Sequence, residues 1–563
     1  MGSGDVALSP APSSSPTVPT SSTERVSPTA QVIRGDDRLL VRPPSAWWFG
    51  TVPMMFLALF FVWPLLNVLV RGFSADGRSA LTSMTTWHVV AFTLEQAVLS
   101  TTLTVVIGLP ASYALYRLHF RGRRWLLALI TVPFVLPTVV VGAAFRGVLP
   151  PSWLGTLGAI VLAHIFFNLA VVVRLVGSHW AQVDERYAQA ARTLGAAPYD
   201  VWRTITWPLL RSAVLAATSL VFLFTFTSFG VVLILGGPTS STLEVEIYRR
   251  AVSLFDLPGA AALCLLQIVA VLVVLVASGR TQRIRGVRHR IRRSATVVPR
   301  SGAERILVGA TVILGVLVAL PLLALLVSSL RVGDRWGLDW WCALSVSGPR
   351  SRDVSAWESI STSLTYAVPA VVVSVGIGGL AACAVAYTRR GHELLDSALM
   401  LPLGTSAVTL GLGLLITSAR GPVDLRGSWL IVPIGQALVA MPLVLRTVLP
   451  VLRALDPRLR DAAALLGAPP WVAWRTVDLP ILSRALGVSA GLAVSVSLGE
   501  FGATSFLARA GSPTMPIHIA HLLERPGESN VGQAAALSII LLVLTASAAA
   551  VAERLSWNRQ ATT

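Results

Sequence analysis

The residue types in this 563-residue chain limit the chemistry that it can perform. All 45 basic residues are arginines, and the sequence contains no lysine. A P-loop of the GxxxxGK[ST] type needs a lysine, because the ammonium group holds the β- and γ-phosphates of the nucleotide. The sequence also has no HExxH pair and no convergent carboxylates for acid–base catalysis. We therefore predict no catalytic residues, no cofactor and no ATPase site on this chain.

The cysteines give no sign of a metal site. Cys264, Cys342 and Cys383 lie far apart in the sequence, unlike the closely spaced ligands of a metal cluster. Two of them, Cys264 and Cys383, fall inside long apolar runs, and no framework of paired cysteines is present. The sequence therefore predicts neither a metal site nor disulfides.

One polar segment occurs twice in the chain, and its residue types favour contact with another protein. The first copy is the run QAARTLG ending at Gly195, and the second is DAAALLG ending at Gly467, 272 residues later. In each copy small alanines allow close approach of a partner surface, and the glycine gives the backbone freedom for a tight corner. The candidate contact residues are Gln189, Ala190, Ala191, Gly195, Asp461, Ala462, Ala463 and Gly467.

The repeat extends well beyond these two runs. A constant offset over more than fifty residues indicates two structural copies in one polypeptide. We therefore expect two homologous halves, each with one such polar loop. The same offset relates three further pairs: Arg174 and Arg446, Pro208 and Pro480, and Phe229 and Phe501.

Long apolar runs must position these loops. The chain is 54% hydrophobic and 13% charged, which excludes an ordinary soluble globular protein. Runs of about 20 apolar residues, enough to cross ~30 Å of hydrocarbon, recur along its length. We predict an all-α polytopic membrane protein with about twelve transmembrane helices in two six-helix halves. The expected spans are near 48–70, 90–116, 125–147, 156–178, 210–236, 258–278, 305–330, 358–387, 394–417, 428–450, 482–508 and 532–553.

The distribution of charge predicts the domain organisation and the topology. Nine arginines fall between Arg280 and Arg305, and a cytoplasmic N-terminus would put them and both polar loops inside, as the positive-inside rule requires. Because the arginines are not interleaved with exposed aromatics, we expect contact with lipid and not with nucleic acid. The predicted segments are a disordered cytoplasmic tail (1–45), a first half (46–278, loop 184–208), an arginine-rich linker (279–304), a second half (305–555, loop 456–480) and a C-terminal tail (556–563).

The repeated loop resembles the EAA loop of permease subunits in bacterial binding-protein-dependent (type I) ABC importers. The resemblance covers residues 48–553 and implies a MetI-like permease fold in the bacterial cell membrane. It also implies that each loop docks on one of two separate ATP-binding cassette ATPase subunits, and that an extracytoplasmic binding protein delivers the solute. Two departures are Gln189 and Asp461, where the family usually has glutamate, and a third is Trp207 in place of leucine.

The fusion of both halves in one chain resembles the permeases for thiamine and for ferric iron. The strings LAHIFFNL (162–169), TLEVEIY (242–248) and SLGEFGA (497–503) are similar to the thiamine type. The resemblance implies import of thiamine or a thiamine compound, with ferric iron as the alternative and another small anion or sugar-like solute as a third. A secondary transporter that works without ATP is the alternative of a different class.

A few residues are candidates for the path of the solute. Glu500 falls in a predicted span, where a carboxylate usually faces a cavity or a partner; pairing with an arginine or a helix terminus is the alternative. Phe229 and Phe501 occupy matching positions and are candidates for a paired hydrophobic gate, with ordinary helix packing as the alternative. Glu244 and Glu246 are expected in an outer segment, either solvated or in contact with the binding protein.

Overall fold

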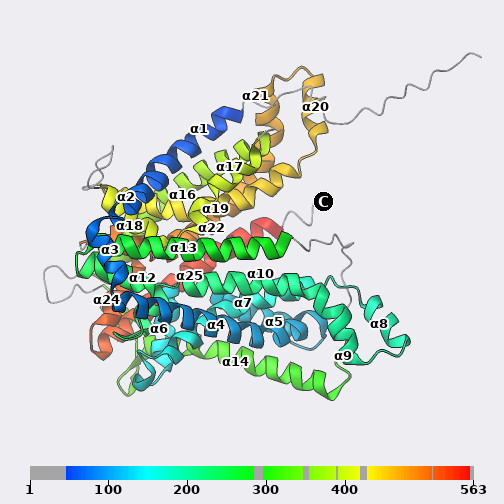
Figure 1. Cartoon of the computed structure of the whole chain (residues 1–563), viewed down its shortest axis with the longest axis horizontal. Coiled ribbons are helices and arrows are strands. Elements are labelled where there is room, and N and C mark those ends of the chain that lie inside the picture. The colour runs from blue at the N-terminus through cyan, green and yellow to red at the C-terminus, as the bar shows by residue number, and fades with distance from the viewer. Residues whose placement is uncertain are drawn as a thin grey trace, which may run out of the picture.

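The protein is a bundle of helices that run mostly along one common axis (Figure 1). The computed structural model describes residues 46–283, 296–345, 354–388, 391–418, 428–509 and 511–557. The predicted N-terminal tail, residues 284–295 of the arginine-rich linker and residues 558–563 lie outside these ranges.

The first half consists of helices joined by short turns. The α-helices are α1 (Ala46–Leu57), α2 (Trp63–Gly72), α3 (Ala75–Thr82), α4 (Met84–Arg117), α5 (Arg123–Val135), α6 (Thr138–Val148), α7 (Leu157–Trp180), α8 (Glu185–Thr193), α9 (Pro198–Val201), α10 (Trp207–Phe226), α11 (Gly230–Leu235), α12 (Leu243–Tyr248) and α13 (Leu257–Arg283). Three π-helical turns, η1 (Ala58–Val62), η3 (Trp202–Thr206) and η4 (Arg249–Ser253), and the 3₁₀ turn η2 (Pro151–Trp153) connect them.

The second half repeats this order with small differences. Its α-helices are α14 (Gly302–Leu330), α15 (Asp339–Ala343), α16 (Ala356–Tyr387), α17 (His392–Leu399), α18 (Ala407–Ser418), α19 (Ile431–Arg453), α20 (Pro457–Leu465), α21 (Pro470–Ala473), α22 (Leu479–Gly499), α23 (Thr504–Leu507), α24 (Met515–Glu524) and α25 (Glu528–Trp557). The connecting turns are η5 (Leu401–Gly404), which is 3₁₀, and η6 (Trp474–Asp478), which is π-helical. An antiparallel pair, β1 (Arg331–Val332) and β2 (Arg335–Trp336), follows α14.

The number of membrane spans differs from the predicted twelve. Among the described residues ten helices are long and apolar enough to cross a membrane, or eleven if one bent pair is counted as a span. That pair, α5 and α6, bends by 111°, because Pro137 disfavours the helical conformation of Leu136, which is extended (φ −72°, ψ 140°). In the second half the span expected at 394–417 is interrupted by η5, and its apolar part is the shorter helix α18.

The fifth expected span of each half is also broken. The span predicted at 210–236 ends at Phe226, where α10 gives way to a short turn and α11. The span predicted at 482–508 ends at Gly499 in the same way, before α23. The apolar run hid both breaks, because only a few polar residues, Thr227 and Ser228 in one half and Glu500 in the other, interrupt it.

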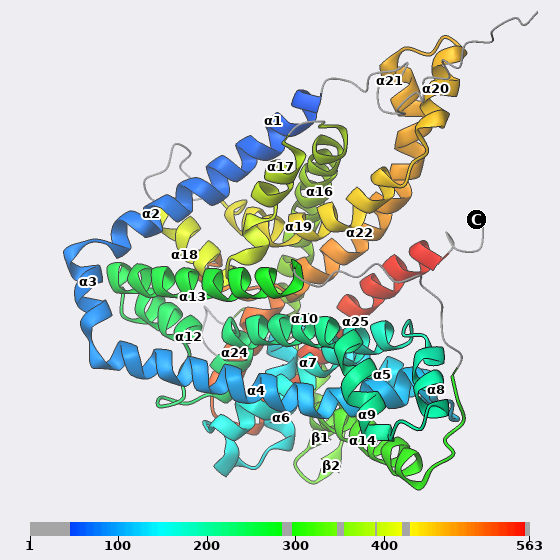
Figure 2. The same cartoon turned by 45° about the vertical axis from the view of Figure 1, so that its right-hand side comes forward.

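The two halves are interlocked at their first helices. Helices α1 and α2 pack against α16 and α18 of the second half, while α14 packs against α4, α5 and α6 of the first (Figure 2). Helices α13 and α25 lie between the two sets. Because each half covers part of the other, a movement between the halves must carry α1 and α14 with their packing partners.

Candidate functional site

The two repeated polar segments form matching helical loops at one end of the bundle (Figure 1). We call residues 184–208 the first repeated loop and residues 456–480 the second. Helix α8 corresponds to α20, α9 to α21, and η3 to η6, each beginning at the same offset of 272 residues. Both loops lie at the right-hand end of the bundle in Figure 1, α8 at the lower right and α20 at the upper right. The sequence repeat is therefore also a repeat of local structure.

Each loop helix begins at an aspartate cap. Asp184 Oδ1 accepts a hydrogen bond of 3.0 Å from the Arg186 amide, and Asp456 Oδ1 accepts one of 3.0 Å from the Arg458 amide. A capping carboxylate satisfies an amide that has no partner inside the helix. It also interacts favourably with the helix dipole, so both short helices are stabilised at their starts.

Each loop helix ends at the expected glycine in a left-handed conformation. Gly195 has φ +86° and Gly467 has φ +83°. The next amide in each loop reaches back five residues, from Ala196 to the Ala191 carbonyl and from Ala468 to the Ala463 carbonyl, both at 3.0 Å. With the glycine amides bonded to Arg192 (3.0 Å) and Ala464 (2.8 Å), this is a Schellman motif in both copies.

The predicted contact residues lie on the exposed side of the loops to different degrees. Gln189, Ala190 and Ala462 are exposed, whereas Ala191, Asp461 and Ala463 are half-buried. Sequence reasoning missed the most exposed apolar pair, Leu194 and Leu466, which are both 89% exposed. Both leucines directly precede the glycine of their copy, so the sequence repeat could have identified them. An apolar side chain held in solvent at the tip of each loop suits a docking surface.

The two loops are held by different arginine contacts: an ion pair with α4 in the first, and an ion pair within the loop plus a contact with α16 in the second. In the first, the buried Arg117 at the end of α4 bonds Glu185 Oε1 at 2.6 Å and the Val183 carbonyl at 3.2 Å. In the second, Arg460 bonds both carboxylate oxygens of Asp478, at 2.6 and 3.0 Å. The Arg460 guanidinium also lies 5.0 Å from the ring centroid of Tyr387, at the end of α16. The backbones are equivalent, but their anchors are not.

Matching tryptophans link each loop to the long helices. Trp202 in η3 packs on Trp180 of α7, with ring centroids 5.8 Å apart. Trp474 in η6 packs on Phe49 of α1 at 5.9 Å and stacks on Trp471 at 5.0 Å. Trp202 and Trp474 share the repeat offset, and the sequence analysis did not single them out. They contact different long helices, α7 in one half and α1 in the other.

The two gate candidates meet between the halves. The rings of Phe229 and Phe501 are stacked, with centroids 5.1 Å apart and planes inclined by 24°. Tyr248 of α12 lies edge-on to Phe229 at 5.4 Å and to Phe506 at 5.6 Å. Phe229 and Phe501 are 6% and 4% exposed, so the cluster is closed. Both phenylalanines stand at the breaks that end α10 and α22, which explains how each reaches the other half.

The glycines that follow the two phenylalanines permit this close contact. A Cβ at Gly230 would collide with the Thr138 side chain and lie 3.2 Å from Phe501 Cδ1. A Cβ at Gly502 would lie 2.9 Å from Ala407 Cβ. The conserved pairing of phenylalanine with glycine inside the repeat therefore has a packing reason in both copies.

Glu500 is held by a helix start, which was the alternative to a role in the path. It is 6% exposed, and its oxygens accept hydrogen bonds from the amides of Ala503 (2.7 Å) and Thr504 (2.9 Å), and from the Thr504 hydroxyl. The carboxylate thus caps α23 directly beside Phe501. Its repeat partner, Ser228, instead lies with Oγ 2.8 Å from His164 Nε2. The two halves differ in their polar groups next to the aromatic cluster.

The two acids expected in an outer segment are buried, so the solvated alternative is wrong for both. Glu244 is fully buried and accepts a hydrogen bond from the Gln267 amide of α13. Glu246 is 1% exposed and pairs with Arg249 and Arg250, both at 2.9 Å. Helix α12 folds inward and packs on α13 and α4, which the polar appearance of its sequence did not indicate. Burial also removes both acids from a surface that could receive a binding protein.

Comparison with known proteins places these loops in a family. Residues 104–286, which include the first repeated loop, match the model of the binding-protein-dependent transport system inner membrane component. The thiamine transport system permease protein ThiP of Brucella abortus (strain 2308) is 28% identical over 501 residues, which cover 84% of this chain and 88% of that one. The chain is similar to these permeases over most of its length.

Other relatives of the permease cover both of its halves. ThiP of Haemophilus influenzae is 26% identical over 517 residues, covering 88% of this chain and 93% of that one. ThiP of Escherichia coli (strain K12) is 28% identical over 487 residues, covering 81% and 87%. The permease is thus an all-α, multi-pass inner-membrane protein and a transport subunit, and the predicted resemblance is confirmed.

Proposed function

We propose that this permease forms the translocation path of an ATP-driven importer for thiamine or a thiamine compound. The similarity to ThiP proteins from three genera supports the substrate, because it extends over both halves and not only over the family domain. The observation that carries the transport mechanism is the pair of exposed loops with a closed aromatic cluster between the halves. Thiamine is a cation, and its import against a gradient needs a source of free energy outside this chain.

Two ATPase subunits and a binding protein are the proposed partners. Two loops with the same backbone and the same exposed leucine favour two equivalent ATPase subunits, one on each loop. Docking on both loops at once would let closure of the ATPase pair move the halves against each other. This end of the bundle, and with it the N-terminus, is then cytoplasmic, and the binding protein delivers its ligand at the opposite end.

The stacked phenylalanines are proposed as the closed gate of an alternating-access cycle. Rigid-body motion of one repeat against the other opens a path between them. An aromatic pair contributes about 0.5–1.5 kcal/mol beyond its burial. A coupling free energy of about 1–3 kcal/mol, typical between two sites of one protein, is enough to separate the rings. The stacking free energy is therefore large enough to hold the rings together at rest. It is small enough for coupling to the loops to separate them.

The proposed substrate is tested by uptake in cells with and without this chain. We expect loss of radiolabelled thiamine uptake under thiamine limitation and unchanged uptake of ferric iron. Loss of iron uptake alone would replace thiamine by the alternative substrate. Thiamine uptake that persists after removal of ATP, in vesicles that retain an ion gradient, would instead favour a secondary transporter.

The gate is tested by removing both rings. In proteoliposomes that contain the permease without ATP, Phe229→Ala with Phe501→Ala is expected to raise passive efflux of trapped radiolabelled thiamine about tenfold. The control removes another aromatic pair, Phe56 and Phe60, whose centroids lie 5.2 Å apart within the segment formed by α1 and η1. Equal leakage from both double variants would contradict a gate at Phe229 and Phe501.

A further inference from the structure

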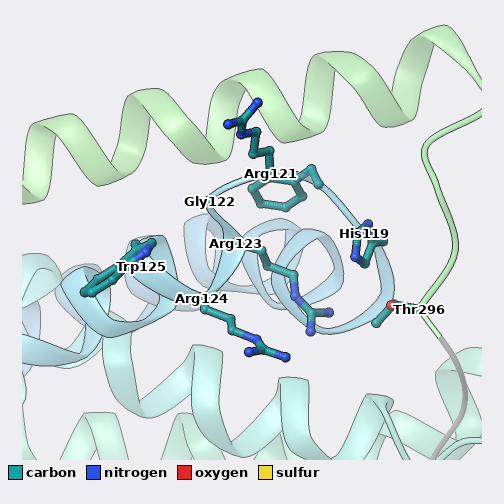
Figure 3. A pocket seen from close by; sticks show the side chains of 8 residues that line it. His119, Arg121, Gly122, Arg123, Arg124, Trp125 and Thr296 are labelled. Atoms are coloured by element: carbon teal, nitrogen blue, oxygen red, sulfur yellow. The ribbon is translucent and has the colours of Figure 1, made fainter.

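A basic pocket lies at the start of α5, beside the end of the arginine-rich linker (Figure 3). It has a volume of about 440 Å³, within the range of small-molecule sites. The short turn between α4 and α5 forms one wall, and the chain that enters α14 forms the other. The polar and aromatic lining consists of His119, Arg121, Arg123, Arg124, Trp125 and Thr296.

The pocket concentrates positive charge that has no partner in the described part of the chain. Arg121, Arg123 and Arg124 line it, and no carboxylate does. None of the three guanidinium groups forms an ion pair with the residues that the structure describes. Figure 3 shows the side chains of Arg123 and Arg124 on one side of the turn and that of Arg121 on the other. Two unpaired arginines, Arg123 and Arg124, therefore share one side of the turn, and guanidinium groups suit a phosphate in particular.

The backbone adds to this preference. Gly122, with φ +86°, precedes α5, and no side chain caps that helix. The Arg123 amide bonds the Phe120 carbonyl at 3.4 Å, and the amides that follow it in this 13-residue helix have no side-chain acceptor at the turn. Uncapped amides and the positive end of the helix dipole favour the same ligand as the arginines.

A neighbouring tryptophan places the pocket at the level of lipid headgroups. Trp125 is 83% exposed and stands one turn into α5. Beyond it, Val132, Phe134 and Val135 are also exposed, as expected of a surface that faces hydrocarbon. Tryptophan is enriched at the interface between hydrocarbon and water. The phosphate available at this depth belongs to a lipid.

We propose that this pocket binds the phosphate of one anionic phospholipid of the cytoplasmic leaflet. The bound headgroup would lie where three segments meet: the turn after α4, the end of the linker and the start of the first repeated loop. The Leu118 segment pairs with Val297 at the end of the linker, with amide-to-carbonyl distances of 2.8 and 2.9 Å. Arg117, the preceding residue, holds Glu185 at the start of the first repeated loop. A bound lipid therefore lies next to the anchor of that loop.

The matching helix start of the second half differs in the residues that the structure describes. Its turn leads into α17 through Gly391, which also has a positive φ (80°). Helix α17 begins with His392 and Glu393, where α5 begins with Arg123 and Arg124. The proposal therefore predicts one tightly bound lipid per chain and not two.

The test is native mass spectrometry of the full chain in detergent, titrated with phosphatidylglycerol. We expect one lipid to bind well before the others, and its affinity to fall about a hundredfold in Arg121→Gln with Arg123→Gln and Arg124→Gln. Single Arg124→Gln, which keeps two arginines in the pocket, is expected to lose affinity by about tenfold or less. The single variant keeps the proposal testable if the triple variant does not fold.

The matched control changes three exposed arginines at the same end of the second half, namely Arg453, Arg475 and Arg484. Equal loss of binding in pocket and control variants would show a diffuse charge effect and overturn the site. Equal affinity for phosphatidylcholine would overturn the preference for an anionic lipid. Displacement of the first lipid by millimolar inorganic phosphate would identify free phosphate as the ligand and overturn the lipid. The proposal is supported if the wild type and the control keep tight binding of the first phosphatidylglycerol and the pocket variants lose it.

Discussion

Replacement of Gly195 and Gly467 by alanine is expected to reduce ATP-driven uptake about tenfold or more. Both glycines adopt a left-handed conformation that costs an alanine about 1–2 kcal/mol. A Cβ at either position meets nothing within 4 Å, so the strain lies in the backbone and not in a clash. Relief of the strain changes the angle between α8 and α9, and between α20 and α21. The measurement is initial uptake rate at equal permease abundance in the membrane.

Two control variants distinguish loop geometry from a general loss of folding. Gly391 also has a positive φ (80°) and open space around its missing Cβ, but it lies outside both loops. We expect Gly391→Ala to change uptake by less than about twofold. Asparagine tolerates the left-handed conformation, so Gly195→Asn with Gly467→Asn should restore most of the rate. Normal uptake in the double alanine variant would show that the loops do not need this corner.

Much of the architecture follows from one sequence pattern. The 272-residue offset predicted two copies. In the structure the first residues of α8 and α20 differ by that offset, as do those of η3 and η6 and of α10 and α22. Local chemistry determines these elements: an aspartate starts each loop helix, and a glycine ends it. Where the residues themselves encode the turn, sequence reasoning was sufficient.

The remaining features depend on contacts between distant segments. Nothing near Glu244 in the sequence indicates that Gln267 of α13 would cover it. The breaks after Phe226 and Gly499 place Phe229 and Phe501 in contact between the halves, and the few polar residues there do not indicate this contact. Pairing of Phe229 with Phe501 needed the relative placement of two repeats, which an offset alone does not give. Hydrophobic periodicity reports the burial of a segment but not its partner.

Replacement of Leu194 and Leu466 by serine is expected to weaken attachment of the ATPase subunits about a hundredfold. Each leucine is 89% exposed in the permease, so its removal deletes little packing within the bundle. Burial of a leucine on docking contributes about 1.5–3 kcal/mol, and about 1.4 kcal/mol corresponds to a tenfold change in affinity. The two loops dock together, so loss at either weakens the other through reduced effective concentration.

Binding of the purified ATPase subunit to the permease in nanodiscs measures this effect directly. The matched control is Leu254→Ser with Leu394→Ser, two leucines that are 60% and 77% exposed but lie outside the loops. We expect the control to bind the ATPase like the wild type. A variant with only Leu194→Ser should keep one docked subunit at concentrations where the double variant keeps none. Equal binding by all four proteins would mean that the ATPase reads the loops through other groups, and would redirect attention to Gln189 and Asp461. Since the ion pairs that anchor the two loops differ, a larger loss from one single variant than from the other would show that the loops share the docking free energy unequally.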